Sequence, residues 1–384
     1  MIYSVQYLRG IAALLIVMFH FRGAINDVFV QKNLGDILFW PGVSGVDLFF
    51  MISGFIIITS TRNGAANSPI AFLVKRIFRV YPLLILAVLA YQLTWWDFET
   101  MPDNPTLIRM VKGMLALNLD YNLPAPYFGY NFLYPAWTIS YEVFFYGVFA
   151  VALSISHRWR GWIASAMILV MVFGLQLHYN GDWSLNADAG LQVVTSRTVT
   201  GIIKLAGSPL LLEFIVGMLL AGIYHSVPSG IHLPKDHWLR RASVAVCWIG
   251  GALYAALYFG PIGNFHGPSG FGMWALVAFV PALFYEKLNA VTPNKALMFL
   301  GEISYSLYMS HIIVMTFFEM HYQRYFPAFP QVIGISRFVL LTLVSIVVAY
   351  LVHVAVEKPA MNIARRLLAA GRRKDTQRGK EIAA

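Results

Sequence analysis

Long apolar stretches alternate with short polar connections along almost the whole chain. An apolar stretch of roughly 17 to 25 residues is long enough to cross the hydrocarbon core of a bilayer as an α-helix. Ten windows meet this condition, at residues 5–22, 43–60, 80–97, 136–155, 161–178, 208–226, 242–258, 268–286, 297–318 and 336–356. The pattern therefore predicts an all-α, polytopic integral membrane bundle of about ten transmembrane helices, with both termini on the same side.

Composition and charge favour a membrane protein over a soluble one. Hydrophobic residues make up 58% of the chain and charged residues 12%, whereas soluble proteins carry about 25% charge. The net charge of +10 comes from basic residues in the connections and the tail, most of them on the side of the termini. By the positive-inside rule this distribution predicts cytoplasmic termini, and it gives no reason to expect a nucleic-acid partner. We expect one membrane domain over residues 1–360 in the lipid bilayer and a basic cytoplasmic tail over residues 361–384.

The first window contains two polar residues, Arg9 and His20, that have no structural use in a membrane helix. A charged residue at membrane depth costs at least ~2.5 kcal/mol. Eleven steps of ~1.5 Å separate the two side chains by ~16 Å along the helix. Histidine accepts and returns a proton near neutral pH, so His20 is a candidate general base. The structural alternative, in which His20 bonds across helices and Arg9 reaches the headgroups, fits the isolated pair equally well.

A second basic pair precedes the third window, where Arg76 and Arg79 lie three residues apart and share one helical face. Two guanidinium groups in this arrangement hold phosphates with bidentate hydrogen bonds. The predicted topology puts them on the cytoplasmic side, where a soluble, phosphate-rich donor is present. Positive-inside anchoring explains the pair equally well.

The second window contains the run GVDLFFMISGF, which begins at Gly45. Gly45, Ser53 and Gly54 are small enough to let a neighbouring helix approach closely. Asp47 is a carboxylate near the outer end of this helix, where it either orients His20, pairs with an arginine or faces water.

Two later windows also carry ionisable residues. The fourth contains WTISYE, which ends at Tyr141 and Glu142, and a carboxylate at that depth needs a partner such as His20 or an arginine. The ninth contains SYSLYMSH, which ends at His311, and a lone histidine inside a helix bundle is more often a packing residue. The ten histidines form no close ligand cluster with carboxylates or with the single Cys247, so no metal site is expected.

Taken in order, these segments resemble the membrane acyltransferase 3 family, whose members O-acylate sugars of lipopolysaccharide, Nod factors and exopolysaccharides in bacteria. The family's arginine, ten-residue gap and histidine fall on Arg9 and His20, and its paired arginines fall on Arg76 and Arg79. Its G-V-D-x-F-F-x-I-S-G-F, W-S/T-I/L-S-x-E and S-Y-S-x-Y-x-x-H runs stand in the second, fourth and ninth windows. The resemblance covers about residues 3–359 and looks closest to the exopolysaccharide O-acetyltransferase branch of the ExoZ type.

The resemblance implies a multi-pass protein of the bacterial inner (cytoplasmic) membrane, and it also implies which reaction the protein catalyses. The reaction is transfer of an acetyl or other short acyl group from acyl-CoA to a hydroxyl of an exopolysaccharide, a lipopolysaccharide or a lipid-linked glycan. Acetyl-CoA is then the expected donor substrate, and the polysaccharide biosynthesis machinery is a candidate partner.

The family's residues imply roles at the matching positions. His20 deprotonates the acceptor hydroxyl or receives the acetyl group transiently. Arg76 and Arg79 bind the phosphates of CoA, and Arg9 engages the donor or supports the structure. This division is consistent with the predicted topology, because the arginine pair faces the cytoplasm while His20 lies closer to the outer side.

Further roles are expected for the remaining polar residues of the motifs. Glu142 is predicted to orient His20, with Asp47 as the second choice. Three other candidates belong to the same motifs: Ser53, Tyr141 and His311.

Two other functional classes remain open. A transporter or flippase for a lipid-linked saccharide also needs charges inside the membrane, but pseudo-symmetric halves are expected there and none is visible. A sensor or scaffold would use the charges for packing alone, which predicts that His20→Ala lowers the protein level and spares any turnover.

Overall fold

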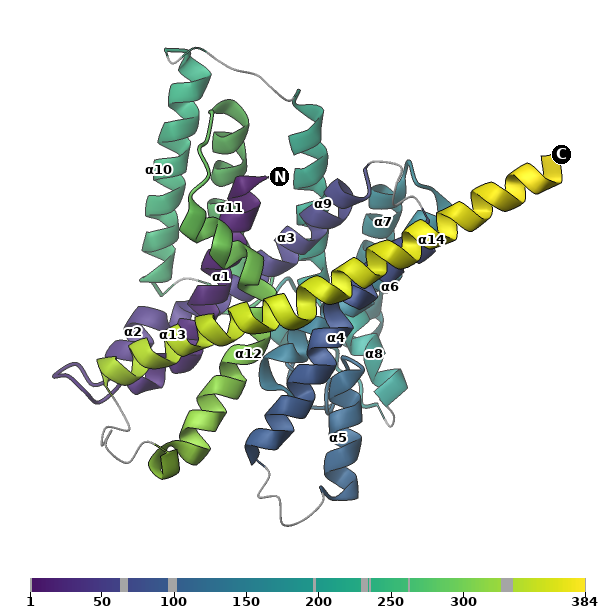
Figure 1. Cartoon of the computed structure of the whole chain (residues 1–384). Helices are drawn as coiled ribbons and strands as arrows, with labels where there is room; N and C mark the ends of the chain where they lie inside the picture. Colours follow the sequence, from purple (N-terminus) through teal and green to yellow (C-terminus); the bar gives the residue numbers. More distant parts are fainter. Residues whose placement is uncertain are drawn as a thin grey trace.

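The structure of the protein is a computed structural model that describes residues 2–62, 68–95, 102–195, 198–228, 234, 236–261, 263–325 and 334–383, except the side chains of 198–199, 322–325 and 372–383. These residues form an all-helical protein, and no strand occurs among them (Figure 1). The α-helices are α1 (Tyr3–Phe21), α2 (Leu34–Phe39), α3 (Gly45–Ser60), α4 (Pro69–Trp95), α5 (Asn104–Met114), α6 (Trp137–Ile155), α7 (Arg160–Asn180), α8 (Thr198–Ala206), α9 (Leu210–Ser226), α10 (Trp238–Tyr258), α11 (Phe271–Leu288), α12 (Lys295–Tyr325), α13 (Ile335–Val352) and α14 (Lys358–Ala383). Short 3₁₀ turns occur at Arg22–Ala24, Trp40–Ser44, Tyr134–Ala136 and Ala187–Ala189, and a π-helical turn at His353–Glu357 joins α13 to α14.

Eight helical stretches within the described ranges are long and apolar enough to cross a membrane, and a bent pair raises the number to nine. In that pair, Thr200–Ala206 and Leu210–Ser226 meet at an angle of 48°. The all-α, multi-pass fold is confirmed, but ten spans are not reached by this criterion. The remaining window, 80–97, falls in α4, which carries the basic residues Lys75, Arg76 and Arg79 before the window begins. Positions 96–97 of the window lie outside the described residues.

The connections between helices gather at two opposite ends of the bundle. At one end, Asn122 of the α5–α6 connection donates a hydrogen bond to the carbonyl oxygen of Thr195, which precedes α8 (2.9 Å). At the other end, Arg160 at the start of α7 donates to Thr61, which follows α3 (2.9 Å). The N-terminus lies at the end of the bundle opposite to the facing ends of α4 and α5 (Figure 1). Connections at two opposite ends are the arrangement expected of helices that cross a membrane in succession.

Glycines let α3 pack directly on α9, and α12 on α1. A Cβ atom on Gly54 of α3 would lie 2.2 Å from a backbone oxygen of α9, and one on Gly217 of α9 would lie 1.9 Å from the carbonyl oxygen of Met51. A Cβ on Gly301 of α12 would lie 2.3 Å from the carbonyl oxygen of Gln6 in α1. The close approach predicted at Gly54 is therefore confirmed, and it sets the spacing of the helices that carry the polar motifs.

We expect Gly217→Ala to destabilise the bundle and Gly222→Ala, in the same helix, to leave it equally or more stable. An added Cβ meets the Met51 carbonyl oxygen at position 217, whereas nothing lies within 4 Å at position 222. Overpacking costs about 1–3 kcal/mol, while alanine favours a helix over glycine by about 1 kcal/mol. Thermal unfolding in detergent should show a lowered midpoint for Gly217→Ala alone. Equal midpoints for the two variants would contradict the close contact.

Candidate functional site

A cavity of about 710 Å³ lies between α1, α3, α4, α6, α12 and the beginning of α14. This volume falls in the range of about 300–1,000 Å³ that is typical of small-molecule sites. Its lining runs from Ser60 and Thr61, where α3 ends, to Val46 and Tyr308 deeper in the bundle. Five residues predicted from the sequence as site residues line it: Arg9, Ser53, Arg76, Arg79 and Glu142. The cavity thus brings together residues that are far apart along the chain.

Positive charge is in excess around this cavity. Six basic side chains line it against three acidic ones, which favours a ligand with several negative charges. The basic residues are Arg9, Lys75, Arg76, Arg79, Lys358 and Arg365, and the acidic residues are Glu142, Glu302 and Glu357.

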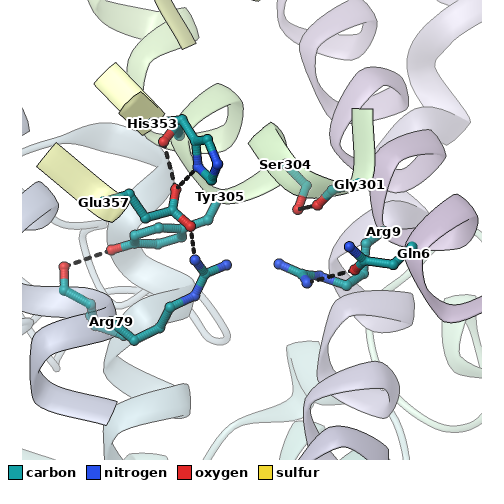
Figure 2. Close-up of polar contacts among 10 residues, drawn as sticks. Gln6, Arg9, Arg79, Gly301, Ser304, Tyr305, His353 and Glu357 are labelled. Atoms are coloured by element: carbon teal, nitrogen blue, oxygen red, sulfur yellow. Dashed lines mark hydrogen bonds and ion pairs between the residues drawn. The ribbon is translucent and has the colours of Figure 1, made fainter. Parts of the chain in front are cut away.

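The guanidinium groups of Arg9 and Arg79 point toward one another across the cavity, from α1 and α4 respectively (Figure 2). Arg9 donates a hydrogen bond to Oε1 of Gln6 (3.0 Å), whereas Arg79 forms an ion pair with Glu357. Two like charges repel when they face one another, and an anion placed between them removes that repulsion. The pair is therefore suited to hold a negatively charged group.

Arg76 lines the same cavity one turn before Arg79. It donates to Oγ of Ser60 (3.1 Å), and its guanidinium carbon lies 5.5 Å and 5.3 Å from the ring centroids of Phe72 and Tyr146. In the part of the chain that the structure describes, no carboxylate forms an ion pair with Arg76. The charge of Arg76 is thus oriented by aromatic rings and a hydroxyl group but is not neutralised by them.

The π-helical turn between α13 and α14 places His353 and Glu357 at the cavity (Figure 2). Pro359 follows two residues later, and a proline ring clashes with the carbonyl group four residues earlier in a regular α-helix, so the wider π turn makes room for it. The turn is closed by a hydrogen bond from the Lys358 N–H to the His353 carbonyl oxygen. Glu357 also accepts from Oγ of Ser306 (2.7 Å), and its Oε2 lies 3.0 Å from Nδ1 of His353.

Glu142 does not orient His20, and that prediction is wrong. The carboxylate of Glu142 accepts hydrogen bonds from Ser53 (2.9 Å) and from Tyr146, and all three residues line the cavity. Tyr146 lies one turn further along α6, which is the spacing at which helical side chains meet. Glu142 faces the cavity arginines because it lies on the side of α6 that is turned toward α3.

Asp47, the second choice for orienting His20, has a different partner as well. It is fully buried, accepts from the N–H of Gly267 (2.9 Å) and lies 2.7 Å from Nδ1 of His266. Both partners belong to the connection between α10 and α11, about 220 residues away, so Asp47 anchors that connection to α3 and the prediction is wrong. The hydroxyl of Tyr141 likewise donates to a carbonyl oxygen of the α5–α6 connection (2.8 Å) and does not line the cavity.

His20 and His311 form a hydrogen-bonded pair between α1 and α12, with 3.1 Å between His20 Nδ1 and His311 Nε2. Each Nδ1 also faces a backbone carbonyl oxygen one turn earlier, that of Ile16 at 2.9 Å and that of Leu307 at 3.1 Å. A carbonyl oxygen only accepts, so both neutral rings carry their proton on Nδ1. His311 Nε2 then accepts from His20, and the lone pair on His20 Nε2 is left to receive a proton from another molecule.

The histidine pair lies just beyond the cavity. His311 is fully buried and His20 half-buried, and neither belongs to the cavity lining. Tyr308 does line the cavity, and its ring centroid lies 6.1 Å from that of His311. The site therefore has two adjoining parts, a basic cavity and a histidine pair. Within the residues that the structure describes, no group of three or more His, Cys, Asp or Glu side chains is placed to hold a metal ion.

Sequence reasoning missed several members of the site. Glu357 carried a signal, because a carboxylate that ends an apolar window directly before Lys-Pro needs a partner. Tyr146 follows Glu142 by one helical turn, which also identifies it in retrospect. Tyr308 carried a signal as well, because it is the second tyrosine of the S-Y-S-x-Y-x-x-H run.

Comparison with known proteins identifies relatives along most of the chain. A family profile described as an acyltransferase domain matches residues 2–354. The exopolysaccharide production protein ExoZ of Rhizobium meliloti is 26% identical over 283 residues, which cover 71% of this chain and 76% of that protein. Nodulation protein 10 of Rhizobium leguminosarum bv. viciae is 25% identical over 293 residues (73% of each chain), and acyltransferase MdmB of Streptomyces mycarofaciens is 24% identical over 397 residues (94% and 92%). No solved structure gives a significant match.

The ion pair between Arg79 and Glu357 should show up as energetic coupling. We expect Glu357→Gln to lower the thermal midpoint, because it leaves the Arg79 charge without its carboxylate. The double variant Arg79→Gln/Glu357→Gln should lose less stability than the two single changes added together, by about 0.5–3 kcal/mol. A double-mutant cycle in detergent measures this difference, with the exposed Arg158→Gln as control. Strictly additive effects would contradict the pairing.

Proposed function

The chain belongs to the acyltransferase family, and we propose that it transfers a short acyl group from acyl-CoA to a sugar hydroxyl. Acetyl is the acyl group we propose. Membership makes it an enzyme that transfers acyl groups, and its apolar helices make it a multi-pass membrane protein. The observation that carries the proposal is the basic cavity that adjoins a histidine pair with one free ring nitrogen.

The cavity is the proposed site of the CoA donor. Its excess of positive charge suits the several negative charges of CoA phosphates, and its volume suits a ligand of cofactor size. Arg9 and Arg79, which face one another, and Arg76, which has no carboxylate partner among the described residues, are the phosphate ligands we propose. Arginine holds phosphate in a bidentate fashion and keeps its charge at all relevant pH values.

His20 is the proposed general base. Its Nε2 takes the proton of the acceptor hydroxyl while the hydroxyl oxygen attacks the thioester carbonyl carbon. The carbon–sulfur bond then breaks, CoA leaves as the thiolate, and the proton held by His20 is available to the thiolate. During this cycle the Nδ1–H of His20 stays directed at His311 Nε2 and the Ile16 carbonyl, which stabilises the imidazolium form.

The relatives support a glycan acceptor and a bacterial membrane. One is named for exopolysaccharide production and another for nodulation, and both come from rhizobia. We therefore propose an exopolysaccharide, a lipopolysaccharide or a lipid-linked precursor as acceptor, in the inner membrane of a bacterium. In that setting the enzyme would work beside the machinery that assembles the polysaccharide.

Replacing the base should abolish transfer without abolishing donor binding. We expect His20→Gln to lower kcat by about 10²–10⁴-fold, the usual contribution of a general base. The measurement is release of free CoA from acetyl-CoA by purified protein in lipid, with total bacterial glycan as acceptor. A well-folded His20→Gln variant with full turnover would exclude His20 as the base.

Removing a cavity arginine should weaken the binding of the donor instead. We expect Arg76→Gln to raise KM for acetyl-CoA about 10-fold, since a hydrogen bond to a charged group contributes about 1.5–3 kcal/mol, and to change kcat little. Arg158→Gln removes an exposed arginine at the same end of the bundle and serves as the matched control. If both variants behave alike, the cavity does not bind the phosphates of the donor.

A further inference from the structure

The cavity stops one helical turn short of the histidine pair. Along α12 its lining includes Glu302, Tyr305 and Tyr308, but not His311, which follows Tyr308 by three residues. At this end the cavity is lined by Tyr308, by Thr138 of α6, and by Phe49 and Val46 of α3. We call the Tyr308 ring, together with Phe49 and Thr138 that contact it, the wall between the two parts of the site.

Hydrogen bonds hold this wall in place. The hydroxyl of Tyr308 donates to the carbonyl oxygen of Pro135 (2.8 Å) and lies 2.8 Å from Oγ1 of Thr138. The Thr138 hydroxyl also lies 3.3 Å from the same Pro135 carbonyl oxygen, so the two hydroxyl groups and this oxygen form one closed cluster. Tyr308 and Thr138 are each only 6% exposed, and the ring of Phe49 stands edge-on to Tyr308 at 5.9 Å. The phenol ring is thus fixed at both ends of its side chain.

The position of the wall matters for the group that is transferred. A donor in the cavity reaches the acceptor only if its thioester carbonyl lies where the cavity meets the histidine pair, about 3–3.5 Å from the attacking oxygen. The acyl chain beyond that carbon then has to occupy space beside Tyr308 and Phe49. Both side chains are packed against their neighbours, so each further methylene group would collide with a fixed ring.

We propose that the Tyr308 ring, backed by Phe49, sets the length of the acyl group by closing the cavity at the histidine pair. This inference rests on the proposed function and adds a specificity-determining residue to it. The ring supplies the steric limit, and the hydroxyl contacts with Pro135 and Thr138 keep the ring in position. Acetyl fits in front of this wall, and linear chains of four or more carbons do not.

The test compares a series of acyl-CoA donors in the CoA-release assay: acetyl-, propionyl-, butyryl- and hexanoyl-CoA. We expect the wild type to prefer acetyl- over hexanoyl-CoA in kcat/KM by at least about 10-fold, because misplaced methylene groups are commonly discriminated by about 10–200-fold. Tyr308→Ala should reduce that preference by about 10-fold or reverse it. Tyr308→Phe retains the ring and its contact with Phe49 but loses the hydroxyl contacts, so it should reduce the preference less than Tyr308→Ala does.

Ile56→Ala is the matched control, since Ile56 lines the cavity two turns further along α3 from Phe49, toward Ser60. It enlarges the cavity away from the wall and should leave the preference unchanged. Phe49→Ala replaces Tyr308→Ala if the latter does not fold. A folded Tyr308→Ala variant with the wild-type preference overturns the proposal, and so does an equal shift in Ile56→Ala.

Equilibrium binding of the same donors separates this inference from the proposed function. The wild type could bind acetyl-CoA more tightly than hexanoyl-CoA without turnover, with the difference removed in Tyr308→Ala. This result would support the length limit set by Tyr308 and contradict the proposed acceptor or the proposed reaction. If the wild type neither binds nor turns over any acyl-CoA, both the proposed donor site and the length limit are contradicted. Binding without any dependence on chain length overturns the length limit alone.

Discussion

A charged side chain inside an apolar helix bundle needs an oppositely charged or hydrogen-bonding partner, or a polar cavity. This constraint determines how the polar residues of the bundle are arranged. Each charge at membrane depth costs about 2.5–3.5 kcal/mol on the lenient scale. Arg9, Arg79, Glu142 and Glu357 come from separate segments of the chain, yet all of them line one cavity. The ion pair between Arg79 and Glu357 joins α4 to the π-helical turn, so the same contact that compensates burial also shapes the binding surface. The residues that compensate one another's charge are thus also the residues that line the cavity.

The histidine pair obeys the same constraint in another way. A neutral imidazole inside the bundle needs a partner for its N–H, and each histidine finds a backbone carbonyl one turn earlier on its own helix. These local bonds fix both neutral rings in the tautomer with the proton on Nδ1, and His20 Nε2 is therefore without a proton. Tyr308 lines the basic cavity and its ring lies 6.1 Å from that of His311, so the cavity and the histidine pair adjoin at this residue.

Residues within one motif have different tasks. In the run that begins at Gly45, Ser53 bonds to Glu142 in the cavity, whereas Asp47 holds the connection between α10 and α11. In the following motif, Glu142 faces the cavity and the adjacent Tyr141 holds the connection between α5 and α6. A helix presents neighbouring residues to different sides, so one motif serves both the site and the frame around it.

The sequence by itself determined the helical membrane fold, the apolar windows and the polar residues that had to be explained, because hydrophobicity sums over a local stretch of chain. It singled out Arg9, Arg76 and Arg79, which line one cavity in the structure, since each stood out against its surroundings. Only the tertiary structure decided the partners: His311 for His20 at a separation of 291 residues, and the cavity rather than His20 for Glu142. A side chain's partner depends on which helices are neighbours and how each is rotated about its axis, and that is settled only when the whole bundle has packed.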